Sequence, residues 1–254
     1  MPDSEAAEEY LRSVAQPGGC FPAGTRITTD KGLVRIEDIK VGDKVLSKSE
    51  SGFGAQEFKP VVRTVKYEHK ELWQLTYCII PADVDSSSIT TKSIKNLSRR
   101  GKVFGISATP NHPFWVKDIG WTALDTLQFG QLIEMKDSGT LAFVVMIRPV
   151  YQTTESDVAA IPSIRNVLDA NARGFEINDE DHYDFKKYKN SGSEILNEQN
   201  SASPLLIEGY KPIHVLKETF LTTVYNFEVA DHHTYYIFDD LWVHNTNCPT
   251  VSVG

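Results

Sequence analysis

The chain has 254 residues, a formal net charge of −8 and 41% hydrophobic residues, a composition typical of a soluble globular protein with an ample core. Its acidic balance disfavours nucleic-acid binding, because neutralising phosphate groups requires an excess of Lys and Arg. No apolar run approaches the roughly 20 residues of a membrane span, and the acidic start MPDSEAAEEYLRS lacks the apolar core of a signal peptide, so a cytoplasmic protein without membrane contact is expected.

Residues 1–19 carry helix formers and then QPGG, which ends any helix, so this segment is predicted to be a flank. From Cys20 onward the sequence changes to short runs rich in Val, Ile, Thr and aromatic residues, with Gly, Pro and Asp between them. This pattern predicts an all-β sandwich or barrel. The runs are TRITT, GLVRIEDI, DKVLSK, PVVRTVKYE, ELWQLTYCII, VFGISATP, HPFWV and LAFVVMI.

The strand pattern is interrupted over residues 150–205, which are polar and rich in Asn, Ser and Asp. This composition predicts a flexible surface insertion with one short helix at 163–172. Strand-like runs resume at HVLKETF, TTVYNFEVA, HTYYIF and LWVHN. The predicted organisation is therefore a β domain in two parts, 20–149 and 206–245, with 150–205 inserted and 246–254 as a second flank.

Cys20 follows Gly18-Gly19 at the start of the β pattern. A lone cysteine is commonly a small buried hydrophobe. Alternatively, its thiolate attacks the preceding carbonyl, which Gly19 leaves accessible, and forms a thioester. The three cysteines are far apart and lack metal-ligand spacing, so no metal site is indicated, and their odd number fits a reducing compartment.

The segment ATPNHPFWV places Thr109, Asn111 and His112 in one turn-like stretch, and Pro113 favours an extended backbone at His112. One interpretation is a Pro-containing turn with a core histidine. The other is that Thr109 and His112 hydrogen-bond the peptide N–H at the N-terminal junction and that His112 then protonates the departing amine.

Two further polar clusters lie near the C-terminus. In YNFEVADHHTYY, alternation places Asn226 and Glu228 on one face of a strand, and the turn that follows contains His232 and His233. In LWVHNT, the Asn245 side-chain nitrogen has the chemistry to attack its own carbonyl and release the downstream chain. Each cluster is also compatible with an ordinary polar turn.

Four segments, taken in order, resemble the splicing blocks of the Hint (Hedgehog/intein) superfamily, including mini-inteins and bacterial intein-like domains. They are CFPAGTRITTDKGLVRIEDIKVGDKVLS (20–47), GKVFGISATPNHPFWV (101–116), TTVYNFEVADHHTYYI (222–237) and LWVHNT (241–246). The resemblance covers nearly the whole β portion. It implies a horseshoe-like, pseudo-symmetric β fold and autocatalytic processing of the chain's own flanks.

At the N-terminal junction the resemblance implies that Cys20 is the first nucleophile and that Thr109 and His112 activate the Gly19–Cys20 bond, with support from Asn111. No cofactor is implied, because every nucleophile and acid lies in the chain. The flanks are the only implied partner, and a monomer is expected.

At the C-terminal junction the resemblance implies that His233 and His244 assist the cyclisation of Asn245 and that Thr246 accepts the acyl group. Asn226 is a departure, since many inteins carry aspartate or cysteine at this position. Asparagine can hydrogen-bond but cannot shuttle a proton near neutral pH, which leaves room for uncoupled cleavage.

Three functions follow as hypotheses. The first is splicing, which joins residues 1–19 to residues 246–254. The second is self-cleavage without efficient ligation, as in toxin-delivery or bacterial intein-like proteins, and the third is a non-catalytic β-sandwich binding module. Cys248 is a competing nucleophile beside Thr246. The 150–205 insertion lacks a paired acidic endonuclease motif, so no DNA cleavage is expected.

Overall fold

The computed structural model describes residues 19–81, 84, 103–137, 139–154, 158–162, 180–184, 194–195, 215–238 and 241–245. Several predicted features lie outside these residues: the helix at 163–172, nearly all of the N-terminal flank, Thr246 and Cys248. Among the residues described, no helix is long and apolar enough to cross a membrane.

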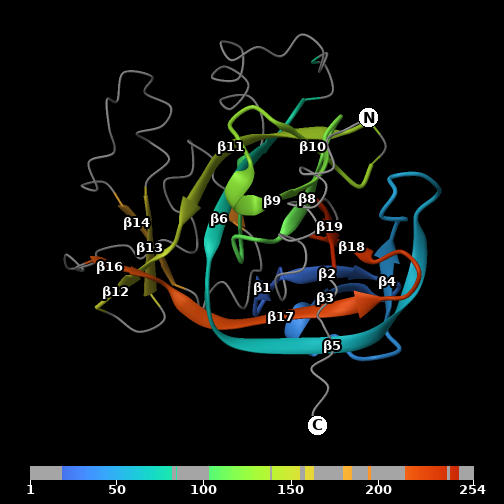
Figure 1. The fold of residues 1–254 in the computed structure, drawn as a ribbon, viewed down its shortest axis with the longest axis horizontal. Helices are drawn as coiled ribbons and strands as arrows, with labels where there is room; N and C mark the ends of the chain where they lie inside the picture. Colours follow the sequence, from blue (N-terminus) through green and yellow to red (C-terminus); the bar gives the residue numbers. More distant parts are fainter. Residues whose placement is uncertain are drawn as a thin grey trace, which may run out of the picture.

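Antiparallel strands dominate the fold and form one large sheet and one small sheet (Figure 1). In spatial order the large sheet contains β1 (Phe21–Pro22), β17 (Leu221–Val229), β5 (Glu57–Glu71), β4 (Lys44–Ser47), β2 (Arg26–Thr29), β18 (Thr234–Ile237), β19 (Leu241–His244), β8 (Pro113–Val116), β10 (Leu132–Glu134), β11 (Leu141–Pro149), β6 (Trp73–Ile79), β7 (Val103–Ala108) and β15 (Glu194–Ile195). Beside this path, β3 (Gly32–Arg35) pairs with β2 and β9 (Gly120–Ala123) pairs with β8. The short 3-10 helices η1 (Ile36–Asp38) and η3 (Leu124–Thr126) connect strands. The all-β prediction is confirmed.

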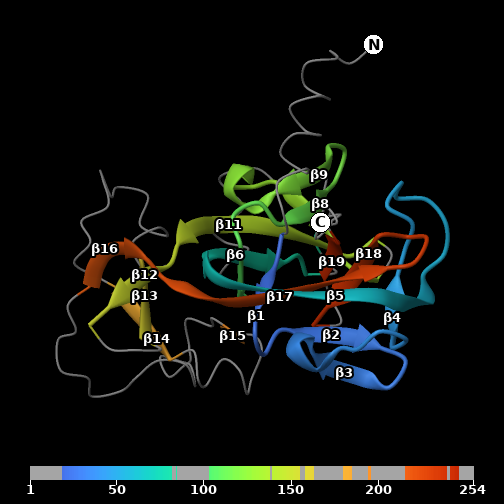
Figure 2. The ribbon, with the colours of Figure 1, turned by 60° about the horizontal axis from the view of Figure 1, so that its bottom comes forward.

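The long pair β5–β17 curves along one side of the molecule, and β8, β9 and β11 lie on the same side of this pair in both views (Figure 1, Figure 2). Apart from the buried Val61, β5 consists of exposed and half-buried residues, many of them charged, as expected of an antiparallel strand with one face in solvent. β18 and β19 are buried along their whole length, and three of the four residues in each are apolar or aromatic, with Thr234 and His244 as the polar members. The segments that resemble splicing blocks therefore include the most buried strands.

Parts of the segment 150–205, where the sequence pattern indicated no strands, form regular structure. β14 (Glu180–Asp184), β13 (Val158–Pro162), β12 (Tyr151–Thr153) and β16 (Val215–Thr219) form, in this order, a four-stranded antiparallel sheet. Its one strongly apolar run, VAAIP, forms β13. In β13, Ala159 and Ile161 are buried in the same cluster as Cys20. Because the prediction for this segment relied on its average composition, a five-residue apolar run within a long polar stretch was not recognised as a strand.

Candidate active site

Strand pairing positions Cys20 next to residues from distant parts of the chain. β1 pairs with β17 so that Phe21 lies opposite Tyr225, and extending this register by one residue places Cys20 opposite Asn226. Thr109 directly follows β7, and its backbone N–H donates to the Cys20 carbonyl at 2.9 Å. Cys20 itself is fully buried.

The amide N–H of Cys20 donates to the Thr109 hydroxyl oxygen at 2.8 Å. The Thr109 hydroxyl in turn donates to Asn111 Oδ1 at 3.0 Å. Because its proton is directed to Asn111, the hydroxyl presents a lone pair to the Cys20 N–H. This is the hydrogen bond to the junction that the sequence led us to expect of Thr109.

The carbonyl of the same peptide bond is held by Asn226, whose Nδ2 donates to Gly19 O at 2.5 Å. Asn226 Oδ1 accepts from the Phe227 N–H at 2.8 Å and from the Tyr235 hydroxyl at 2.9 Å. Two donors on Oδ1 leave Nδ2 as the group that faces Gly19, so the amide orientation is determined. Tyr235 is a site residue that the sequence reasoning missed. The available signal was a tyrosine within a buried strand, whose hydroxyl requires a partner.

His112 is fully buried and lies against the junction. Its ring is 4.1 Å from the Phe21 ring and 5.6 Å from the Phe114 ring, measured between centroids. A Cβ added to Gly19 would lie 2.7 Å from the His112 Cα and 2.8 Å from Nδ1. Glycine is therefore required at position 19 for close approach of the backbone.

Burial lowers the pKa of His112 to about 3, with a further lowering from His244 and an opposing contribution from the Gly19 backbone. Within the described part of the chain, neither ring nitrogen has a hydrogen-bond partner. His112 is therefore neutral near neutral pH. The expected hydrogen bond between His112 and the N–H of the junction is not formed, because that N–H donates to Thr109. The sequence reasoning also expected His112 to protonate the departing amine, and the neutral ring must gain a proton before it can do so.

The C-terminal junction lies close to the same histidine. β19 pairs with β8 so that Val243 lies opposite Phe114, and extending this register by two residues places Asn245 opposite His112. The Asn245 N–H donates to the His233 carbonyl at 2.9 Å. The pairing of β19 with β8 and β18 therefore brings the two ends of the predicted domain together.

Asn245 is fully buried, and its side-chain Nδ2 and Oδ1 make no hydrogen bond to any described residue. Buried amides are nearly always hydrogen-bonded, so an unpaired one requires an explanation, and a reactive role is one. His233 contacts Asn245 through its backbone carbonyl. Its φ of 55° places it in the left-handed region, within the turn that joins β17 to β18.

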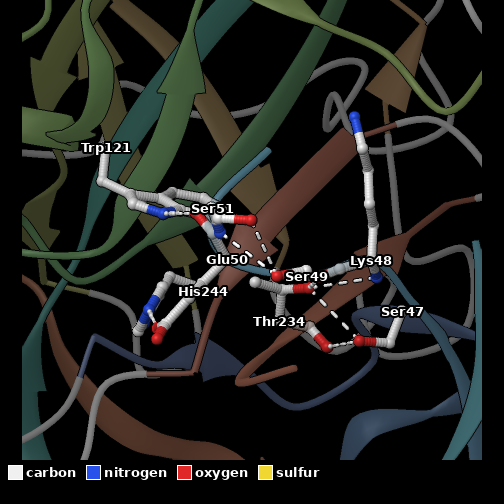
Figure 3. Close-up of polar contacts among 8 residues, drawn as sticks. All are labelled: Ser47, Lys48, Ser49, Glu50, Ser51, Trp121, Thr234 and His244. Atoms are coloured by element: carbon white, nitrogen blue, oxygen red, sulfur yellow. Dashed lines mark hydrogen bonds and ion pairs between the residues drawn. The ribbon is translucent and has the colours of Figure 1, made fainter. Parts of the chain in front are cut away.

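His244 precedes Asn245 and is held by a side chain that the sequence did not single out. His244 Nε2 lies 2.8 Å from Glu50 Oε2, and its ring packs against the edge of Trp121, with 4.9 Å between centroids and an interplanar angle of 77° (Figure 3). Burial lowers the pKa of His244, and Glu50 opposes that shift.

Outside this site, the features relevant to its chemistry are one further cysteine and the arrangement of possible metal ligands. Cys78 lies in a separate buried cluster, where burial raises the pKa of its thiol to about 12, so it stays a thiol near neutral pH. No three His, Cys, Asp or Glu side chains in the described ranges gather closely enough to hold a metal ion.

Comparison with known proteins gives solved structures of inteins and of an intein-like domain, the same class of protein as the sequence resemblance. The bacterial intein-like domain from Clostridium thermocellum is 24% identical, with a TM-score of 0.47 over 90% of this chain and 99% of that one. The DnaB intein from Synechocystis sp. PCC 6803 is 15% identical, with a TM-score of 0.45 over 90% and 99%. The DnaX mini intein from Spirulina platensis is 16% identical, with a TM-score of 0.44 over 89% and 99%. No protein-family model and no curated protein matches the chain.

Proposed function

We propose that this chain is an autocatalytic splicing domain of the Hint type that acts in cis on its own flanks. The observation that carries the proposal is a pair of side-chain hydrogen bonds to one peptide group. Thr109 binds the N–H of Gly19–Cys20 and Asn226 binds its C=O, from positions 89 and 207 residues away in the chain. A purely structural peptide bond in a β protein is normally satisfied by backbone partners.

In the first step the Cys20 sulfur attacks the Gly19 carbonyl carbon, and the bond from that carbon to the Cys20 nitrogen breaks. Asn226 Nδ2 stabilises the negative charge that develops on the Gly19 oxygen. The proton lost by the thiol ends on the new Cys20 amine. His112 is neutral at rest and adjacent to Gly19, so it is suited to carry that proton.

In the later steps the Thr246 hydroxyl takes the acyl group from the Cys20 thioester. Asn245 Nδ2 then attacks its own carbonyl carbon, which breaks the bond to Thr246 and forms a succinimide. An ester-to-amide shift finally joins Gly19 to Thr246. The unpaired, buried amide of Asn245 supports this sequence of steps, because no competing hydrogen bond within the described residues has to break first.

A second candidate, cleavage at the two ends without efficient ligation, is favoured by the environment of Asn226. Its amide hydrogen-bonds Gly19, Phe227 and Tyr235. Because an amide does not titrate near neutral pH, Asn226 cannot relay a proton between the two junctions. In that case Cys20 and Asn245 each sever a bond, and water or a small thiol removes the N-terminal flank.

The test is intact-mass analysis of the expressed chain beside Cys20→Ala and Asn245→Ala. Splicing predicts a ligated product of residues 1–19 and 246–254, whereas uncoupled cleavage predicts separate flanks. Cys20→Ala should abolish cleavage before residue 20, and Asn245→Ala should retain the tail and make the N-terminal flank removable by thiol. Identical processing of all three proteins would contradict both candidates, and an intact parent of constant mass is the result expected of a binding module.

A further inference from the structure

Glu50 is placed on His244 by the loop of residues 48–56 between β4 and β5 (Figure 3). Its carboxylate oxygen lies 2.8 Å from His244 Nε2. The Glu50 side chain is 49% exposed, whereas that of His244 is only 9% exposed. The pair therefore links a nearly buried imidazole to a carboxylate that reaches solvent.

Both backbone polar groups of Glu50 are hydrogen-bonded. Its N–H donates to the His232 carbonyl at 3.1 Å, and its carbonyl accepts from the Trp121 indole N–H at 3.0 Å. Just before it in the loop, the Thr234 hydroxyl donates to the Lys48 carbonyl. Thr234 lies directly opposite His244 in the β18–β19 pair, so the loop is attached to the strand that neighbours the histidine (Figure 3).

The contact with Glu50 assigns different roles to the two nitrogens of the His244 ring. An ionised carboxylate only accepts hydrogen bonds, so Nε2 carries the proton and Nδ1 has a free lone pair in the neutral ring. Nδ1 is buried and has no hydrogen-bond partner among the described residues. Packing of the ring against Trp121 restrains its rotation. An oriented base with a free nitrogen therefore directly precedes Asn245.

Burial and three groups influence the charge on this ring. Burial has the largest effect and favours the neutral form, as does His233, whereas the Glu50 carboxylate and the Asn245 backbone favour the protonated form. The charge of His244 also influences His112. Glu50 is the only carboxylate among these influences, so replacing it with a neutral residue is expected to favour the neutral form of the His244 ring.

We propose that Glu50 is a positioning residue for the C-terminal step, which orients His244 and maintains its basicity so that the ring takes up a proton at Nδ1 and delivers it to the departing amine of Thr246. In this step the Nδ2–H and the Asn245–Thr246 C–N bonds break, the succinimide C–N bond forms, and the proton ends on the amine. This inference rests on the proposed function.

The kinetic test uses the Cys20→Ala protein, in which only the tail is released, and compares Glu50→Gln and Glu50→Asp with the parent across pH. Glu50→Gln should slow tail release about tenfold and move the acid limb of the profile about one pH unit lower. Glu50→Asp should recover part of the rate, because it restores the charge. Glu57→Gln is the matched control, since its carboxylate pairs with Lys59 on the surface.

An unchanged rate and an unchanged pH limb for Glu50→Gln would overturn the inference. So would a slower rate accompanied only by a lower melting temperature. NMR titration of His244 in the Asn245→Ala protein tests the contact with Glu50 without tail release. Glu50→Gln should lower the titration midpoint of His244, and an unchanged midpoint would contradict the positioning role of Glu50. If the Cys20→Ala protein itself keeps its tail, cyclisation of Asn245 requires the acyl transfer to Thr246, and the same variants are then compared for tail release with Cys20 intact. Failure of the chain with Cys20 intact to release its tail would instead contradict the proposed function.

Discussion

Replacing Asn226 by aspartate tests the hold on the Gly19 carbonyl at almost constant side-chain volume. The substitution exchanges the Nδ2 donor, 2.5 Å from Gly19 O, for a carboxylate oxygen that only accepts when ionised. Because the side chain is only 3% exposed, the resulting repulsion between oxygens is poorly screened. Loss of one donor at a developing oxyanion typically slows the step about 100-fold to 1,000-fold.

The sign of the pH dependence is also predicted. Burial of the new carboxyl raises its pKa, and its protonated form regains one O–H donor, so Asn226→Asp should recover activity as the pH falls. The assay is thiol-induced release of residues 1–19 from the Asn245→Ala protein, followed by intact mass at several pH values. Tyr235→Phe is the graded comparison. It keeps the Nδ2 donor and removes one bond that orients it, for an expected slowing of about threefold to tenfold.

If Asn226→Asp released the flank as fast as the parent near neutral pH, the contact with the Gly19 carbonyl would not contribute to the slow step. A faster rate would show that a titratable group at this position is more useful than a donor, as in inteins that carry aspartate there. Melting temperatures of both variants separate a loss of chemistry from a loss of folding.

Gly19→Ala should destabilise the protein by about 1–3 kcal/mol and slow N-terminal cleavage, because its Cβ would lie 2.7 Å from the His112 backbone; thermal melting and thiol-induced release measure both effects. The buried neutral His112, with its pKa near 3, favours the folded state fully above pH 6.5, and this contribution is lost as the pH falls toward 3, by about 1.4 kcal/mol per pH unit. His112→Gln should therefore show a flatter acid dependence of urea unfolding, and an unchanged slope would contradict the assignment. Ile161→Ala should speed alkylation of Cys20 by iodoacetamide, whereas Ile133→Ala, a cavity in the main core, should not.

The fold class could be predicted from the sequence. β-branched and aromatic runs with regular turn residues are local signals, so the all-β prediction did not depend on knowing which strands pair. The segments that carry Cys20, Thr109-x-x-His112 and His244-Asn245 were each ambiguous alone, and their order along the chain carried the resemblance. The hydrogen bond from the junction N–H to Thr109 was one of two interpretations of its segment, and the structure contains it.

Tertiary structure alone decided which side chains surround these residues. The sequence reasoning considered Asn226 only as a residue that cannot transfer a proton. In the structure it is a hydrogen-bond donor to the Gly19 carbonyl, 207 residues away. Tyr235 and Glu50 carried no motif, and Glu50 meets His244 across 194 residues. The polar segment 150–205 concealed β13, which packs in the cluster around Cys20. The physical reason is that each of these contacts depends on long-range packing. For Asn226 and Tyr235 it is the register of antiparallel pairing, because a shift of one residue would turn each side chain to the other face of its strand. For Glu50 it is the path of the loop between β4 and β5.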